Sequence, residues 1–239
     1  FIKTNKDVKY NYMNYLLFVV IIVLCFLIHT IFNCKYNDKI TYFNSKISYN
    51  KKKLLKLIEE KGVTKDPKKN FNNSSCKVLN FHNISNNCNY YIKKFYNDEF
   101  LEKIKKKINV ENLYFMDPNF EPLCFAIQLY KKNDYMKYHF DTNFTLGTRY
   151  TIIIPLYINN FNESYLFIKD KNNVEKKVII DIGKGIIYNG DNVYHKVSKQ
   201  STKGKRISLI INLTTNPNYN FFGKIMQNIR NFMFINYTW

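Results

Sequence analysis

His139 and Asp141 lie two residues apart in the stretch KYHFDTNF, in a part of the chain that is rich in aromatic residues. Successive side chains of a β-strand point to opposite faces, so in a strand these two would point the same way. Directing an imidazole and a carboxylate together into a sheet costs free energy unless a metal ion or hydrogen bonds satisfy them. The pair is therefore a candidate for metal binding, with hydrogen-bonded polar residues as the alternative.

A third ligand has to come from elsewhere in the chain, which holds four histidines. His29 falls in a long apolar run and His82 in an Asn-rich segment, whereas His195 stands in the strand-like stretch VYHKVS. Two imidazoles and one carboxylate in the order His-x-Asp…His form the facial triad that holds Fe(II) and leaves coordination positions open. We predict a metal site made of His139, Asp141 and His195.

Arg206 adds a second kind of group to this pattern, eleven residues after His195 in the stretch GKRISL. A strand-borne guanidinium beside a metal pocket is costly unless it pairs with an anion, and its planar fork suits a carboxylate. Ser208 shares the face of Arg206 and can donate a further hydrogen bond. The set predicts a metal ion together with a carboxylate ligand.

Residues 76–215 resemble the iron- and 2-oxoglutarate-dependent dioxygenases, and most of all the prolyl 4-hydroxylase-like branch. The stretch IQLYKKNDYMKYHFDTN is similar to that branch's pattern of Gln, two Tyr and His-x-Asp. RYTIIIPLYIN resembles its strand that ends in Tyr-Leu-Asn, and IGKGIIYNGDNVYHKVSKQSTKGKRISL resembles its closing Gly, distal His and Gly-x-Arg-x-Ser.

The resemblance implies a set of catalytic iron ligands and a set of residues that bind the cosubstrate. The ligands would be His139, Asp141 and His195, and Arg206 would hold the distal carboxylate of 2-oxoglutarate, assisted by Tyr130, Tyr157 and Ser208. It also implies Fe(II), O₂ and ascorbate, and a hydroxylation of a C–H bond coupled to decarboxylation of 2-oxoglutarate to succinate and CO₂. A peptidyl proline, or a similar residue of a protein or peptide, is the implied substrate.

The sequence departs from the family pattern at two places. The branch usually places its basic residue ten positions after the distal histidine, where this chain has Lys205, and Arg206 follows at eleven. We expect Arg206 to enter the pocket because it begins the Arg-x-Ser alternation after Gly204, and Lys205 to face the other way. The segment NNFNESYLF replaces the acidic or glycine-rich segment that is common after the Tyr-Leu-Asn strand.

Two other functions compete with a peptidyl hydroxylase. A net charge of +19 suggests a nucleic-acid oxygenase of the same superfamily, but the lysines are dispersed and Asn212 stands where that branch has a second arginine. A small-molecule oxygenase also stays open. A non-catalytic, membrane-tethered binding domain is the alternative from another class, and the complete ligand set argues against it.

The remaining pattern predicts a mainly β fold with flanking helices. After Asp117-Pro118, short β-patterned segments follow one another with Gly-, Asn- and Asp-rich turns between them, as in a double-stranded β-helix, or jelly roll. KVLNFHNI is predicted as a first strand, and NDEFLEKIKKKINV as a helix that Asn97 caps. Cys76 and Cys88 are predicted either to form a disulfide in a lumenal domain or to stay free.

The two ends of the chain carry further signals. Residues 15–32, after an N-terminal tail of residues 1–14, form an uncharged apolar run that would span about 27 Å as a helix. We predict a single-pass membrane anchor, with a Lys/Asn-rich stalk at 33–75 that includes the helical stretch KKKLLKLIEEKGV. The positive charges on the two flanks are balanced, so orientation stays open.

We expect the dioxygenase domain to lie in the lumen of the endoplasmic reticulum, from the resemblance and from glycosylation sequons at Asn72, Asn73, Asn83, Asn143, Asn162, Asn212 and Asn236. Residues 216–239 are predicted to hold an amphipathic helix with an apolar stripe of Phe221, Phe222, Ile225, Met226, Ile229, Phe232 and Met233. Packing of this stripe on the domain is the expectation, with membrane contact or dimerisation as alternatives.

Overall fold

The computed structural model describes residues 38–47, 50–65, 74–159, 163–200 and 203–235, which belong to one compact unit, Tyr36–Trp239. The predicted N-terminal tail and the predicted anchor at residues 15–32 lie outside the described residues. Among the residues that are described, no helix has both the length and the apolar character to cross a bilayer.

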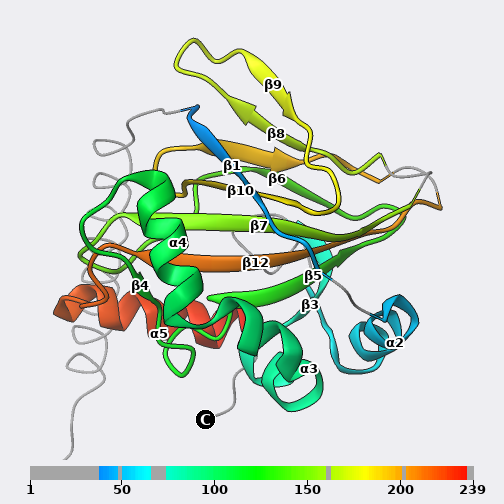
Figure 1. Ribbon diagram of the computed structural model, residues 1–239, viewed down its shortest axis with the longest axis horizontal. Helices are drawn as coiled ribbons and strands as arrows, with labels where there is room; N and C mark the ends of the chain where they lie inside the picture. The colour runs from blue at the N-terminus through cyan, green and yellow to red at the C-terminus, as the bar shows by residue number, and fades with distance from the viewer. Residues whose placement is uncertain (1–37, 48–49, 66–73, 160–162, 201–202, 236–239) are drawn as a thin grey trace, which may run out of the picture. The chain divides into compact units, whose positions relative to one another are not determined.

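A curled antiparallel sheet forms the body of this unit (Figure 1). Its strands follow the order β1 (Ile40–Asn44), β10 (Lys184–Asn189), β7 (Arg149–Ile158), β12 (Arg206–Thr214), β5 (Phe125–Tyr130), β3 (Ser74–Leu79), β6 (Tyr135–His139), β11 (Tyr194–Val197), β8 (Leu166–Lys169) and β9 (Glu175–Val178). Two short strands, β2 (Val63–Lys65) and β4 (Tyr114–Phe115), pair with β3 and β12. Every segment predicted as a strand after Asp117 forms one, and the architecture is consistent with the predicted jelly roll.

The central strands are buried on both faces, and the side chains of each face belong to a separate apolar cluster. Along β12, Ile207, Leu209, Ile211 and Leu213 join a large apolar core that includes residues of the helices. Strand side chains on the other face, such as Ala126 and Ile186, form a second cluster. We call the face of this second cluster the interior face, and it carries the polar residues of the candidate site.

Three helices, α2 (Lys51–Lys61), α3 (Phe81–Phe95) and α4 (Asp98–Ile108), lie on the side of the larger core (Figure 1). The predicted cap is confirmed, because the side chain of Asn97 accepts a hydrogen bond from the amide of Phe100 at 2.8 Å. The strand predicted for KVLNFHNI, in contrast, ends at Leu79. Asn80 caps α3 by accepting from the amide of Asn83, so the second half of that stretch is helical.

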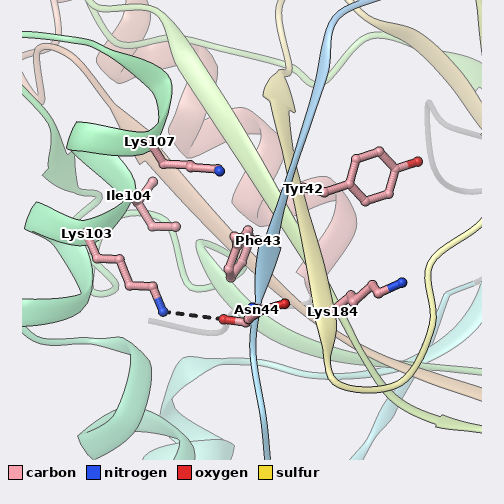
Figure 2. A pocket seen from close by; sticks show the side chains of 7 residues that line it. All are labelled: Tyr42, Phe43, Asn44, Lys103, Ile104, Lys107 and Lys184. Carbon is pink, nitrogen blue, oxygen red and sulfur yellow. Dashed lines mark hydrogen bonds between the residues drawn. The ribbon is translucent and has the colours of Figure 1, made fainter.

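The interpretation of residues 33–75 as a stalk is wrong for the part that the structure describes. Strand β1 pairs with β10 along its length, and Leu54 and Ile58 of α2 are buried in the larger core. Figure 2 shows Phe43 and Ile104 close together where β1 lies beside α4, with the Lys103 ammonium reaching the Asn44 carbonyl oxygen at 3.4 Å. A lysine-rich segment with few apolar residues therefore still contributes to the core.

Helix α5 (Phe221–Ile235) contacts the domain through polar side chains. Gln227 and Asn231 are buried, and the Asn231 amide donates to the Phe120 carbonyl oxygen at 2.7 Å. Arg230 donates to the buried carboxylate of Glu121 at 3.2 Å. Polar groups buried around Phe120 and Glu121 require hydrogen-bond partners, and α5 supplies them.

The predicted packing of the apolar stripe of α5 is accordingly wrong for three of its residues. Phe221 is 73% exposed, Phe222 is 59% exposed and Ile229 is 42% exposed. Gly223 approaches the domain closely, since a Cβ atom there would lie 2.4 Å from the Phe144 carbonyl oxygen. Contact through Gly223 and Gln227 turns the two phenylalanines outward.

Cys76, Cys88 and Cys124, the cysteines that the structure describes, form no disulfide. Cys76 lies in the interior cluster, and Cys88 packs against the larger core on the opposite face of the sheet. A disulfide between Cys76 and Cys88 would have to pass through the sheet, so the free-thiol alternative holds in this structure.

Candidate metal centre

The structure brings His139, Asp141 and His195 together on the interior face. Strands β6 and β11 pair so that the two histidines are direct partners, with ring centroids 4.2 Å apart. The Oδ1 atom of Asp141 lies 3.7 Å from His139 Nε2 and 3.8 Å from His195 Nε2. One nitrogen or oxygen atom from each of the three residues lies within 4.8 Å of the others, which is close enough to bind one metal ion.

Backbone carbonyl groups orient both imidazoles in the same way. His139 Nδ1 lies 2.8 Å from the Lys137 carbonyl oxygen, and His195 Nδ1 lies 3.0 Å from the Val193 carbonyl oxygen. A carbonyl oxygen only accepts, so each Nδ1 carries the hydrogen and each Nε2 presents its lone pair to the centre. In the neutral imidazoles, Nε2 is then the nitrogen that can coordinate a metal ion.

Asp141 is held by hydrogen bonds that leave one oxygen available. Its Oδ2 accepts from the Thr151 hydroxyl at 2.5 Å, and its amide donates to the Gly190 carbonyl oxygen at 3.0 Å. A side chain at Gly190 would place Cβ 2.8 Å from the same Oδ2, so this approach requires glycine. Burial opposes ionisation, but the positive charges of His195 and His139 in their protonated forms, and that of Arg149, hold the pKa of Asp141 below its ordinary value, so the carboxylate is charged.

The donor set fits ferrous iron. Two imidazole nitrogens and one carboxylate oxygen, clustered at the open end of two strands, form the combination that non-haem Fe(II) oxygenases use, with positions left for further ligands. The remaining described histidine, His82, lies in α3 beside the Phe81 ring and is not part of the cluster.

Arg206 is buried on the interior face, as the strand alternation predicts, and is 4% exposed. Its Nε donates to the Ser208 hydroxyl at 3.1 Å, and its Nη1 donates to the Ser164 carbonyl oxygen at 3.3 Å. No carboxylate of the described residues forms an ion pair with it, and burial lowers the pKa of Arg206. Arg206 also lines a cavity of about 330 Å³, whose wall includes neither the three metal ligands nor Lys205, which is half-buried.

Tyr130 and Tyr157, the two tyrosines of the resemblance, lie on opposite faces. Tyr130 is the register partner of Arg206 on β5, lies in the interior cluster and donates from its hydroxyl to Gln128 at 3.2 Å. Tyr157 packs against the helix-side core, with the Lys51 ammonium 3.7 Å from the centre of its ring. The structure therefore brings Tyr130 to the site and does not bring Tyr157 there.

A β-bulge explains the position of Tyr157. The β12–β7 register pairs Ser208 with Pro155 and Ile207 with Tyr157, so Leu156 is an extra residue in the ladder. Without this bulge Tyr157 would share the face of Ile153, which is in the interior cluster. After the bulge Ile158 faces the cavity beside Arg206 in its place.

Comparison with solved structures identifies the fold. A prolyl-4-hydroxylase from Pseudomonas putida has a TM-score of 0.53 at 13% identity, covering 75% of this chain and 93% of that one. A prolyl hydroxylase from Trichoplax adhaerens, in complex with a peptide fragment of the hypoxia inducible factor oxygen degradation domain, has a TM-score of 0.50 at 12% identity, covering 78% and 86%. The epimerase SnoN, in complex with Fe3+, alpha ketoglutarate and nogalamycin RO, has a TM-score of 0.53 at 9% identity, covering 78% and 84%.

The chain has the 2-oxoglutarate–Fe(II) oxygenase fold. No family model and no curated sequence matches it, so the likeness rests on three-dimensional structure and on the His-Asp-His cluster.

Two groups that support the His-Asp-His cluster were not singled out by the sequence analysis. Thr151 on β7 holds Asp141, and Arg149 donates to the Thr142 carbonyl oxygen at 3.0 Å while its other nitrogen pairs with buried Glu121 at 2.6 Å. Glu121 comes from a loop outside the motifs, so strand periodicity contains no signal for this contact. For Thr151 the sequence does contain a signal. Thr151 and Ile153 are two residues apart in one strand and share a face, which predicts an interior position for Thr151.

We predict that Thr151→Val weakens metal binding about 10- to 100-fold, because the Asp141 carboxylate loses the hydrogen bond that orients it. Isothermal titration of the metal-free chain with Co(II) measures this affinity. His195→Ala should abolish binding, while His82→Ala and Thr64→Val, at an α3 histidine and an exposed β2 threonine, serve as matched controls. Unchanged affinity in Thr151→Val, or equal losses in the controls, would contradict the assignment.

Proposed function

We propose that this protein is an Fe(II)- and 2-oxoglutarate-dependent oxygenase that hydroxylates a C–H bond. The observation that carries the proposal is the buried, positively charged Arg206, without a carboxylate partner among the described residues, on the same interior face as the His-Asp-His cluster. A buried charge requires a counter-charge, and a dicarboxylic 2-oxo acid supplies one while offering its other end to a metal ion. SnoN, which shares the fold, is solved with Fe3+ and alpha ketoglutarate.

In this proposal each interior residue has one task. His139, Asp141 and His195 would hold Fe(II), which when bound supplies the redox chemistry that couples decarboxylation of 2-oxoglutarate to substrate oxidation. Arg206 and Ser208 would bind the distal carboxylate through charge-assisted hydrogen bonds. Tyr130 would close the cosubstrate pocket against water, since it is 1% exposed beside Arg206.

For the substrate we propose a prolyl residue, or a similar residue, of a peptide. Support comes from the motif resemblance and from two structural neighbours that are prolyl hydroxylases, one of them in complex with a peptide. A small-molecule substrate is the alternative, because SnoN is in complex with nogalamycin RO. Ascorbate, as an accessory reductant, belongs to this proposal on the resemblance alone.

The full chain loaded with Fe(II) is expected to release succinate from 2-oxoglutarate faster when proline-rich peptides are present, and to add one oxygen atom to them. Succinate is measured by chromatography and the peptide by mass spectrometry. His195→Ala should release none, and His82→Ala should match the wild type. Succinate release without any response to the peptide panel would reject the peptide substrate, and an absence of succinate in every condition would reject the proposed activity.

The second prediction of this function separates Arg206 from Lys205. Arg206→Ala should raise the KM for 2-oxoglutarate about 30-fold or more, since a buried charged partner of a carboxylate is lost, while metal affinity is retained. Lys205→Ala should leave the KM unchanged, because strand alternation directs Lys205 away from the face that holds Arg206 and Ser208. The reverse pattern would show that the spacing of ten residues is the functional one.

We also propose that residues 15–32 anchor the protein in a membrane, on the basis of their length and lack of charge. Membranes that contain the full chain should keep it after alkaline carbonate extraction, and a chain without residues 15–32 should be released. Release of the full chain would refute the anchor. Lumenal placement stays a prediction, to which buried Asn212 adds no support because a glycan cannot attach there.

A further inference from the structure

Tyr188 is a buried residue that faces the metal ligands and that no motif singled out. It lies on β10, is 2% exposed, and its hydroxyl oxygen is 3.2 Å from His195 Nε2, the nitrogen that points to the centre. Its ring meets the imidazole edge-on at a centroid distance of 5.1 Å. Its register partner on β7 is Thr151, which holds Asp141.

The hydrogen bond between Tyr188 and His195 has a defined direction. His195 Nδ1 donates to the Val193 carbonyl oxygen, so in the neutral imidazole Nε2 carries a lone pair and accepts from the tyrosine hydroxyl. A metal ion would use the same lone pair. If a metal ion takes this lone pair, the Tyr188 hydroxyl would need another acceptor, at a buried position where an unmade hydrogen bond is costly.

The surroundings of Tyr188 connect it to the metal ligands and to the residues next to Arg206. The Asp141 Oδ2 atom already accepts from Thr151, and Tyr188 lies in the same interior cluster as Tyr130, the register partner of Arg206. Tyr188 thus lies at the metal end of the interior face, and Tyr130 of the same cluster lies at the Arg206 end. Tyr157, the second tyrosine implied by the resemblance, lies on the opposite face.

We propose that Tyr188 positions the cosubstrate by donating its hydroxyl hydrogen to the 2-oxo acid end of 2-oxoglutarate, the end next to His195. This inference rests on the proposed function. It divides the binding of 2-oxoglutarate between two residues, with Tyr188 at the metal end and Arg206 at the distal carboxylate.

The test uses Tyr188→Phe, which removes one oxygen atom and keeps the ring, in the full chain loaded with Co(II). Isothermal titration should show an affinity for 2-oxoglutarate about tenfold lower or more, from the loss of a hydrogen bond to a charged group. Metal affinity should not fall, because the variant removes a competitor for His195 Nε2. Tyr157→Phe, the matched control, should change neither affinity.

A second ligand distinguishes binding at the 2-oxo acid end of 2-oxoglutarate from binding at its distal carboxylate. 2-Oxopentanoate keeps the 2-oxo acid end and replaces the distal carboxylate with a methyl group. Tyr188→Phe should weaken binding of both ligands by the same factor, whereas Arg206→Ala should weaken only 2-oxoglutarate. A Tyr188→Phe variant that binds 2-oxoglutarate like the wild type, or that loses metal affinity by the same factor, overturns the inference. A loaded wild type that does not bind 2-oxoglutarate overturns the proposed function and this inference with it.

Discussion

One face of strand β12 packs against the helices, and its other face carries the polar groups of the interior. The rest of the structure depends on this alternation. Ile207, Leu209, Ile211 and Leu213 anchor the sheet to the helices, and all four are fully buried. Arg206, Ser208 and Asn212, on the other face, are equally inaccessible but polar. Burial of the apolar face stabilises the domain. This free energy offsets the cost of burying polar groups on the interior face.

Two buried arginines show how this cost is met in different ways. Arg149 pairs with Glu121, and the Glu121 carboxylate raises the pKa of Arg149 against the opposing effect of burial. Arg206 has only neutral acceptors, the Ser208 hydroxyl and the Ser164 carbonyl oxygen, and burial lowers its pKa. The first arginine is satisfied by the fold itself. The second is satisfied only partly, which is the condition expected of a group whose counter-charge comes from a ligand.

Local signals in the sequence were sufficient for the strands after Asp117, for helix α4 and for the residues that the cluster contains. Asn97, the β-patterned segments and the parity of His139, Asp141 and Arg206 each depend on the backbone geometry of their own segment. Tyr157 could not be placed, because one extra residue, Leu156, changes the face of everything after it in β7. The outward face of α5 and the burial of Leu54 and Ile58 depend on distant partners, so no local periodicity could show them.

Helix α5 and the metal cluster are linked through one buried carboxylate. Glu121 accepts from Arg230 of α5 and from Arg149 of β7, and Arg149 also holds the Thr142 carbonyl next to Asp141. The polar side of α5 gives the Glu121 carboxylate a second cationic partner. The two guanidinium groups together lower the pKa of Glu121 against the effect of burial. An apolar helix face on Glu121 would leave that carboxylate with a single partner, and Arg149 less firmly fixed beneath the Asp141 loop. Helix α5 therefore turns its polar side to the domain and leaves Phe221 and Phe222 exposed. The same requirement shapes the interior face, since a buried charge needs an opposite charge close by.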